Sequence, residues 1–390
     1  HNFGDLLFPH IATALTGSKD ALFAGLAKRD LRSCGGHRVE ALAEVAARWR
    51  DRPANIFHVG GELLTCDAWQ AAVMLLPADE ARQAIAQLDR QPNTRMAWAR
   101  RALGLSSLAP YILSRDRFPC AAAVVFNAIG GVDLDHIDPA VRGEVLAKLA
   151  AADYVSARDK YTQALLAAAG IAAPLIPDCA VMVAELFGAP IRERSHNGEV
   201  AQILQAFPQG YIAVQFNADF GDDETLAEIA AQLDRVALSS GYGVALFRAG
   251  AAPWHDDLTC YQHLAARMRV SAAKIFKSLD VWDICALIAH SRGYCGSSLH
   301  GRIVAMAFAL PRMNMIHPAQ VAQRTKQAAF AATWEAAGVP AIAGVDQIAD
   351  GMRDALATDP EQRRYTAGEL AARYRQGYDA IRAVLRQEPV

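Results

Sequence analysis

Long hydrophobic runs are missing from this sequence: no stretch reaches the roughly 18 uninterrupted apolar residues that a membrane-spanning helix needs. Cysteine is sparse, with seven scattered residues and no Cys-x-x-Cys pair, so neither a zinc site nor a redox pair is indicated. We expect these thiols to be buried and reduced, as in a cytosolic protein. No cluster of ligand residues predicts a metal site.

Neither sign of charge dominates the composition. Lys and Arg number 39, Asp and Glu number 41, and the formal net charge is -2. This balance argues against a protein that binds nucleic acid by neutralising phosphates. The sequence also lacks G-x-G-x-x-G and G-x-x-x-x-G-K-[ST], so dinucleotide-binding and P-loop motifs are not supported.

What the sequence does contain is the pattern of a large folded α/β protein. Its 390 residues are 53% hydrophobic and 21% charged, which excludes a disordered chain and predicts about two domains. Short apolar runs alternate with helical patterns, as in proteins with parallel sheets. Strands are predicted at 56–59, 122–126, 154–156, 211–216, 244–247, 275–276, 293–296 and 312–316. Helices are predicted at 6–15, 67–76, 78–88, 139–151, 159–169, 222–239, 258–267, 280–290, 299–308 and 359–386.

The pattern is interrupted between residues 185 and 197, where Gly188, Pro190 and a polar cluster fall. We therefore predict two Rossmann-like domains, residues 1–190 and residues 191–390, the second of which includes a long C-terminal helix. Open parallel sheets bind ligands beyond the carboxyl ends of their strands. A cleft between two such domains facing each other is thus the expected place for a site.

The segment 293–302 (GYCGSSLHGR) carries the sharpest signal, because a strand ends in glycine and a helix then begins. Ser297 or Ser298 suits the N-cap, and the free N–H groups of a helix start attract phosphate or carboxylate. His300 and Arg302 would lie in the first helical turn, next to Gly301. The alternative is a capping serine and a histidine with a purely structural role, and the spacing does not decide between them.

Two other turns carry residues suited to ligand binding. Asn2, Gly4 and Asp5 precede the first helical pattern, where they could bind a ligand or simply shape the turn. Gly60-Gly61-Glu62 follows a strand, and glycines there let the backbone approach a ligand closely.

Two basic residues complete the candidate set. Arg158 joins a strand to a helix and could hold phosphate or carboxylate, or form an ion pair within the fold. Lys326 lies after the strand at 312–316 and could add a cation to the same site, or belong to a solvated basic face.

Taken in order, these segments resemble the polysaccharide pyruvyl transferase family. The resemblance extends from about residue 1 to 335. Its residues are Asn2-Phe3-Gly4-Asp5, Gly60-Gly61, Ser156-Ala157-Arg158-Asp159, Pro177-Asp178, Ser298-Leu299-His300-Gly301, the helix 303–310 ending in Pro311, and Lys326. Many members have arginine where this chain has Ser298, and a third glycine where it has Glu62.

The resemblance implies a glycosyltransferase-B-like (GT-B) fold and a defined reaction. Such enzymes move the pyruvyl group of phosphoenolpyruvate onto sugar hydroxyls of a polysaccharide or lipid-linked oligosaccharide, forming a ketal and releasing phosphate. No cofactor is implied besides phosphoenolpyruvate as donor substrate. The N-terminal domain would take the acceptor and the C-terminal domain the donor.

The resemblance also implies roles for individual residues. His300 is the implied proton donor, and Arg158 and Lys326 match basic positions expected to hold the donor's phosphate and carboxylate. Arg302 and the helix N-terminus would add positive charge. Asp5 or Glu62 is the candidate base for the sugar hydroxyl.

Two other functions stay open. The first is a nucleotide-sugar glycosyltransferase, for which Glu335 or Asp346 would bind the ribose. The second is a non-catalytic scaffold in envelope glycan assembly, which the missing arginine before Leu299 would favour.

The expected location is cytoplasmic, because phosphoenolpyruvate is a cytosolic metabolite and the sequence shows no export or membrane signal. A peripheral contact with the inner face of the membrane is an added expectation, carried by the arginines of the C-terminal helix. These are Arg363, Arg364, Arg373, Arg375, Arg382 and Arg386. The alternative is a solvated helix face, since Glu361, Glu369 and Asp379 are interspersed.

Overall fold

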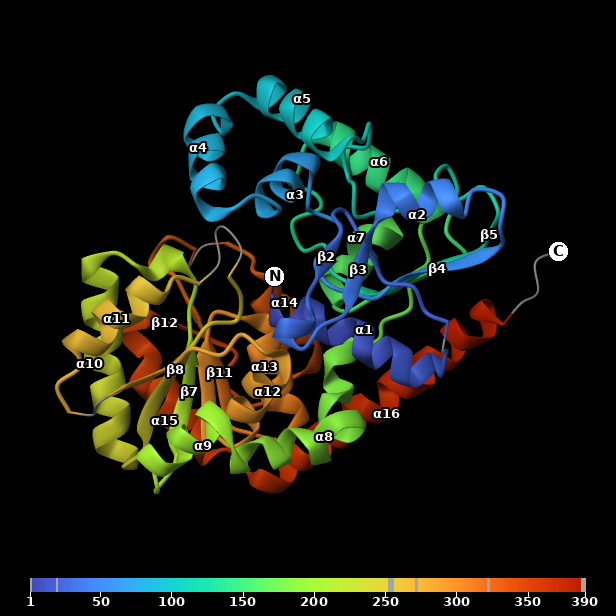
Figure 1. The fold of residues 1–390 in the computed structure, drawn as a ribbon. Coiled ribbons are helices and arrows are strands. Elements are labelled where there is room, and N and C mark those ends of the chain that lie inside the picture. Colours follow the sequence, from blue (N-terminus) through green and yellow to red (C-terminus); the bar gives the residue numbers. More distant parts are fainter. Residues whose placement is uncertain (1, 19, 252–255, 271–272, 321–322, 387–390) are drawn as a thin grey trace. The chain divides into compact units, whose positions relative to one another are not determined.

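The computed structural model describes all residues except 1, 19, 252–255, 271–272, 321–322 and 387–390. It divides into two compact units, each built from more than one stretch of chain (Figure 1). The C-terminal unit contains His1–Leu7 and Ala180–Ala372, and the N-terminal unit contains Phe8–Cys179 and Arg373–Val390.

The C-terminal unit is built on a six-stranded sheet in which every pairing is parallel. Its strands are β7 (Tyr211–Gln215), β8 (Gly243–Phe247), β9 (Lys274–Phe276), β10 (Gly293–Gly296), β11 (Arg312–Ile316) and β12 (Ile342–Gly344). They lie in the order β12-β11-β10-β7-β8-β9. This is the doubly wound order of Rossmann folds, and the winding direction reverses between β7 and β10.

Helices cover both faces of this sheet (Figure 1). One face carries α10 (Asp223–Ser240), α11 (Leu258–Arg267) and α15 (Ile348–Ala357), whose apolar residues join the strands in one core. The other helices are α8 (Val183–Glu193), α9 (Gly198–Ala206), α12 (Val281–Ala289), α13 (Leu299–Ala307) and α14 (Lys326–Trp334). Because both faces are covered, β7 and β8 are buried at every residue rather than at alternate residues.

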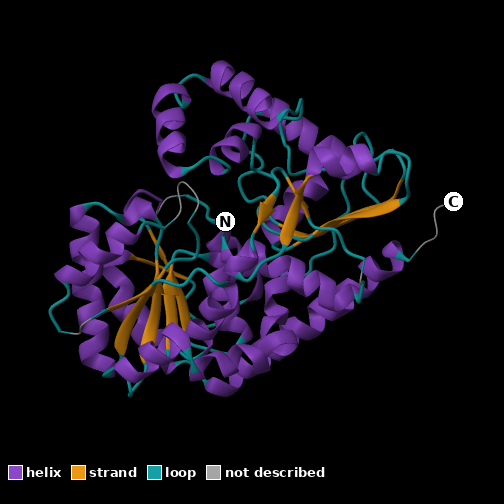
Figure 2. Cartoon of the chain, viewed as in Figure 1, coloured by secondary structure: helices purple, strands orange, loops and turns teal. Residues whose placement is uncertain are grey.

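The N-terminal unit has a smaller parallel sheet, β4-β5-β6, and a separate three-stranded sheet, β1-β3-β2 (Figure 2). The main strands are β4 (Ala54–His58), β5 (Ala121–Ile129) and β6 (Tyr154–Ala157), and the short ones are β1 (Ala24–Gly25), β2 (Arg29–Asp30) and β3 (Arg38–Ala41). The helices are α1 (Phe3–Thr16, begun in the C-terminal unit), α2 (Leu42–Arg48), α3 (Ala68–Met74), α4 (Ala78–Leu88), α5 (Pro92–Leu103), α6 (Pro139–Ala150) and α7 (Lys160–Ala168). Helices α3 to α5 bury a small core of their own around Trp69.

The division of the chain differs from the predicted boundary after residue 190. No unit boundary falls within residues 185–197, because α8 continues through Gly188 and Pro190 and packs against α12 and α13. The first residues of the chain join the C-terminal unit. Helix α16 (Pro360–Leu385), predicted as a long C-terminal helix, contributes to both units.

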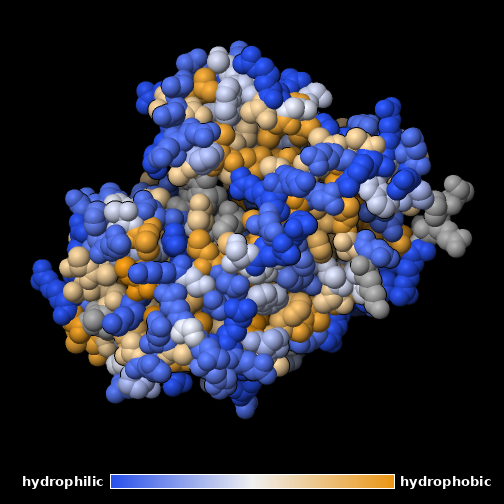
Figure 3. All heavy atoms as spheres, in the orientation of Figure 1, coloured by the Kyte–Doolittle hydropathy of each residue, from blue (hydrophilic) through white to orange (hydrophobic). Residues whose placement is uncertain are grey.

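Most of the surface in Figure 3 is hydrophilic, with smaller apolar areas among the charged residues. Among the described residues, no helix is long and apolar enough to cross a membrane. Of the α16 arginines, Arg363 is only 9% exposed and donates to the carbonyl of Ala309 at 3.0 Å, so it does not belong to an exposed basic face. Arg382 is paired with Asp379 at 3.1 Å.

His58, at the end of β4, predicts a pH dependence of stability. Its Nδ1 lies 3.0 Å from the carbonyl of Val125 and its Nε2 accepts from the N–H of Leu113 at 3.0 Å, which fixes the neutral ring. Burial lowers the pKa of His58 from 6.5 to about 4. The unfolded chain therefore takes up this proton below about pH 6.5, whereas the folded protein resists it until about pH 4.

Because of His58, we expect the free energy of unfolding to fall by up to about 3 kcal/mol as the pH falls from 6.5 to 4. Denaturant unfolding at several pH values measures it. His58→Gln should flatten this part of the pH dependence even though it lowers stability at pH 7.5. An unchanged slope would contradict the assignment.

Candidate functional site

The turn between β10 and α13 lies where the sheet reverses its winding direction. Ser298 caps α13, its Oγ accepting from the N–H of Gly301 at 3.2 Å. Gln215, at the end of β7, holds this turn twice: its backbone carbonyl accepts from Ser297 N–H at 3.0 Å, and its Oε1 accepts from Ser298 N–H at 2.8 Å. The strand thus ends at Gly296 and the helix is capped by Ser298, as predicted from the sequence.

His300 occupies the first turn of α13 and is 9% exposed. The ring of Phe3 meets the imidazole edge-on at a centroid distance of 6.3 Å. Gly4 lies directly against the same ring, since a Cβ at Gly4 would fall 2.1 Å from Nδ1 of His300. Phe3 and Gly4 therefore contact the imidazole of His300, which lies almost 300 residues later in the sequence.

The N-terminal segment is fixed in place by hydrogen bonds. The Oδ1 atom of Asn2 accepts from Gly4 N–H at 3.1 Å, so Asn2 shapes the turn that carries Gly4. Phe3 N–H donates to the carbonyl of Ala249 at 2.7 Å. Asp5, the candidate base, is exposed in the first turn of α1.

A polar network that the sequence analysis missed lies at the same edge of the sheet. Asp256 is 8% exposed, and both of its carboxylate oxygens accept from Nε2 of Gln215 at 2.9 Å. Its Oδ2 also accepts from Ala249 N–H. Burial raises the pKa of Asp256 to about 7, although these hydrogen bonds favour the ionised form. The sequence does contain one signal for Asp256, because a polar residue that follows β8 is expected at the carboxyl edge of the sheet, where ligands bind.

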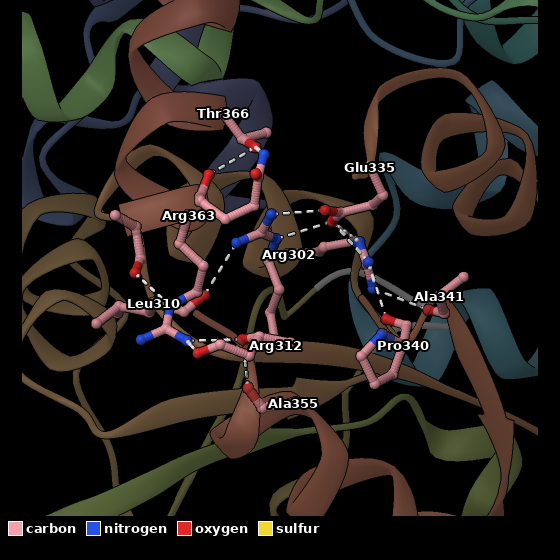
Figure 4. Close-up of polar contacts among 12 residues, drawn as sticks. Arg302, Leu310, Arg312, Glu335, Pro340, Ala341, Ala355, Arg363 and Thr366 are labelled. Carbon is pink, nitrogen blue, oxygen red and sulfur yellow. Dashed lines mark hydrogen bonds and ion pairs between the residues drawn. The ribbon is translucent and has the colours of Figure 1, made fainter. Parts of the chain in front are cut away.

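Arg302 lies in the core of the C-terminal unit and does not add charge to the His300 turn. Its guanidinium is fully buried and donates to Glu335 through Nε and Nη2, at 2.9 and 2.6 Å (Figure 4). It also donates to the carbonyls of Pro340 and Ala341. Arg312 binds the other side of Glu335 at 2.6 Å. The expectation that Arg302 adds positive charge beside His300 is therefore wrong, because its donors are used inside the fold.

Arg158 likewise forms ion pairs inside the fold, here in the N-terminal unit. Its guanidinium is 1% exposed and forms ion pairs with Glu62 and, at 3.3 Å, with Asp178. Gly130 makes room for this cluster, since a Cβ there would lie 2.5 Å from Nη2 of Arg158. One guanidinium against two carboxylates has a negative formal charge, which does not favour a doubly anionic donor.

The glycine-rich turn holds Glu62 in this cluster. Gly60 and Gly61 have φ of 128° and 97°, which side-chain-bearing residues rarely adopt. Glu62 accepts from Val132 N–H at 3.0 Å besides its pairing with Arg158. Its carboxylate is therefore engaged in the fold rather than poised as a base.

Lys326 is exposed at the first position of α14. The next residue, Gln327, donates from Nε2 to the carbonyl of Ser297 at 2.6 Å. This bond ties the start of α14 to the turn before His300. Lys326 thus lies at the start of the helix that adjoins the candidate site. Within the described residues, no group of three or more His, Cys, Asp or Glu residues could hold a metal ion.

Comparisons with known proteins agree with this architecture. The family model described as polysaccharide pyruvyl transferase matches residues 127–313, which confirms the resemblance over that range. This range includes Arg158 and His300 but not Asp5, Glu62 or Lys326. No curated protein sequence matches the chain.

Among solved structures, the S. aureus MnaA–UDP complex is similar with a TM-score of 0.54 at 11% identity, covering 99% of this chain and 95% of that one. The UDP-GlcNAc 2-epimerase from Methanocaldococcus jannaschii has a TM-score of 0.48 at 11% identity, covering 87% and 79%. The first likeness extends over both units and confirms the predicted α/β, GT-B-like fold class.

The contact between Gly4 and His300 predicts that Gly4→Ala displaces the imidazole, because a methyl group cannot fit 2.1 Å from Nδ1. The 13Cε1 NMR signal of His300 should shift, and a crystal structure should show the ring or residues 2–5 moved. Gly368→Ala, in α16, is the matched control, since its Cβ would meet no atom within 4 Å. An unmoved ring in Gly4→Ala would refute the packing described here.

Proposed function

We propose that this chain, whose residues 127–313 match the polysaccharide pyruvyl transferase family, transfers the pyruvyl group of phosphoenolpyruvate to two hydroxyls of a glycan. The products are a pyruvate ketal and inorganic phosphate. The matched family supports the broader statement that the protein is a glycan-modifying transferase. The observation that carries the proposal is the placement of His300, in the matched range, at the reversal point of the C-terminal sheet.

The donor chemistry fits the surroundings of His300. Phosphoenolpyruvate carries a phosphate and a carboxylate, so it needs positive groups that are not already neutralised. The N-terminus of α13 supplies a positive helix end, and exposed Lys326 supplies a mobile cation on the adjoining α14. The buried clusters around Arg302 and Arg158 are left out of this donor site, because each arginine is already bound to carboxylates.

In the proposed reaction, protonated His300 donates a proton to the methylene carbon of phosphoenolpyruvate. The adjacent carbon becomes oxocarbenium-like, and a sugar hydroxyl attacks it while losing its proton to a base. Phosphate then leaves with the electron pair of its C–O bond. A second sugar hydroxyl attacks the same carbon and loses its proton, which closes the ketal. Exposed Asp5, next to the segment that backs His300, is the remaining candidate base.

We assign the donor to the C-terminal unit and the acceptor, a polysaccharide or lipid-linked oligosaccharide, to the N-terminal unit. The proposed location is the cytoplasm, where phosphoenolpyruvate is available. Peripheral contact with the membrane would bring the enzyme to a lipid-linked acceptor. Such contact would rely on the exposed arginines of α16, without Arg363.

A nucleotide-sugar transferase is the second candidate, since the similar MnaA structure is a complex with UDP. Of the two carboxylates suggested for a ribose, Glu335 is 4% exposed at its side chain and held between Arg302 and Arg312. Asp346 is exposed. The burial of Glu335 weighs against this candidate, and UDP binding measured by calorimetry tests it.

His300→Ala should lower phosphate release from phosphoenolpyruvate by about 10²–10⁴-fold, the usual contribution of a general acid. Release is measured with wild-type protein and a panel of candidate glycan acceptors. His263→Ala, an exposed histidine of α11, is the control and should keep full activity. Phosphate release that survives His300→Ala would reject the assigned acid. UDP binding without donor turnover would favour the second candidate, and neither activity would favour a scaffold.

Lys326→Ala should raise the KM for phosphoenolpyruvate about tenfold, the effect of losing roughly 1.4 kcal/mol of binding, while kcat changes less. The reason is the loss of one cation facing the donor. Lys274→Ala, an exposed lysine of β9, serves as the charge-matched control. Equal KM values for both variants would remove Lys326 from the donor site.

A further inference from the structure

We propose that Asp256 is a positioning residue for His300, because its carboxylate fixes both segments between which the imidazole lies. The catalytic part of this inference rests on the proposed function. Its structural part stands on the hydrogen bonds of the C-terminal unit alone.

The first path runs from Asp256 to the helix that carries His300. Both carboxylate oxygens accept from Nε2 of Gln215 at 2.9 Å. An ionised carboxylate can only accept, so it sets which end of the Gln215 amide faces it. Oε1 of Gln215 must then face the N–H of Ser298, which donates to it at 2.8 Å. Asp256 thereby sets the N-cap from which the first turn of α13 begins.

The second path runs from Asp256 to the segment behind the imidazole. Oδ2 of Asp256 accepts from Ala249 N–H. The carbonyl of Ala249 accepts from Phe3 N–H at 2.7 Å. Phe3 packs edge-on against His300, and Gly4 lies against the ring itself. The same carboxylate thus supports the surface on which the imidazole rests.

These two paths meet at one buried side chain, which distinguishes Asp256 from an ordinary buried aspartate. Tyr261, from α11, also contacts it, with its hydroxyl 3.4 Å from Oδ2. Displacement of either support would move the imidazole relative to a bound donor. Misplacement of a reacting group by about 1 Å can cost on the order of 10²-fold in rate.

The donor and acceptor in the hydrogen bonds between Gln215 and Asp256 can be exchanged by mutation. Asp256→Asn replaces one of the two acceptors facing Nε2 of Gln215 with an N–H₂ group, so that contact sets two donors against each other while the remaining carbonyl still accepts. Gln215→Glu places two carboxylates side by side. The double variant Gln215→Glu/Asp256→Asn restores a donor–acceptor match: the asparagine donates to the new glutamate, and its carbonyl still accepts from Ala249 N–H. The glutamate then accepts from Ser298 N–H.

The experiment compares the wild-type protein, both single variants and the double variant at pH 8. Two readouts are taken: the 13Cε1 NMR signal of His300, assigned by its loss in His300→Gln, and kcat for phosphate release from phosphoenolpyruvate. Each single variant should shift the His300 signal and lower kcat by about 10²-fold, with a smaller change in KM. The double variant should restore both to within a few fold of the wild type.

The matched control is Asp234→Asn, which changes another buried carboxylate of the same unit. Asp234 is 9% exposed and accepts from the N–H groups of Arg269 and Val270, at 2.8 and 3.1 Å. This variant should lower the unfolding temperature without moving the His300 signal.

The proposal is overturned if Asp256→Asn folds with an unchanged His300 signal and kcat, or if the double variant is no better than the singles. Should Asp256→Asn fail to fold, the double variant decides alone, because it is expected to fold and to keep the wild-type signal. If the wild type releases no phosphate, the proposed function fails, and the NMR comparison still decides the positioning role.

Discussion

The reversal of winding direction between β7 and β10 is the constraint on which the candidate site depends. Two neighbouring parallel strands end there with their connections leading to opposite faces of the sheet, so the space beyond them is not filled by a crossover helix. Gln215 uses both its backbone and its side chain to fix the turn that follows β10. His300 has a defined position because Gln215, at the end of β7, hydrogen-bonds to the start of α13, the helix that carries His300.

Both units bury an arginine with carboxylates at positions where the sequence suggested an anion-binding arginine. In the C-terminal unit, two arginines share Glu335, and in the N-terminal unit, Arg158 faces two carboxylates. A buried charge is tolerated only when paired and hydrogen-bonded, and removing one partner is far more costly than its removal at a surface. These ion pairs therefore stabilise the unit in which each of them lies. In the proposed function, positive charge for the donor comes from the N-terminus of α13 and from exposed Lys326 instead.

Much of the fold could be predicted from the sequence, because buried parallel strands are short apolar runs and helix starts carry capping residues. The strand 293–296, the cap at Ser298 and the first-turn position of His300 follow from such local patterns. The expectation for Arg302 was wrong because residues two apart in a helix do not face the same side, so Arg302 and His300 of α13 point in different directions. Its partner Glu335 comes 33 residues later and could not be predicted from the local pattern. Asp256 was missed because its partners Gln215 and Ala249 come from two different strand ends. The domain boundary was predicted within α8 because Gly188 and Pro190 are weak helix formers, whose low propensity is overridden by tertiary packing.

The chain passes from one unit to the other at three places: after Leu7, after Cys179 and after Ala372. Neither unit is therefore encoded by one uninterrupted stretch. A gene fragment starting near residue 180 lacks the few N-terminal residues that lie against His300, and a fragment ending there lacks the last turns of α16, where Tyr374 bonds Asn127 at 3.1 Å. Independent expression of either half would call for a rearranged gene, in which the distant terminal piece is rejoined through a designed connection.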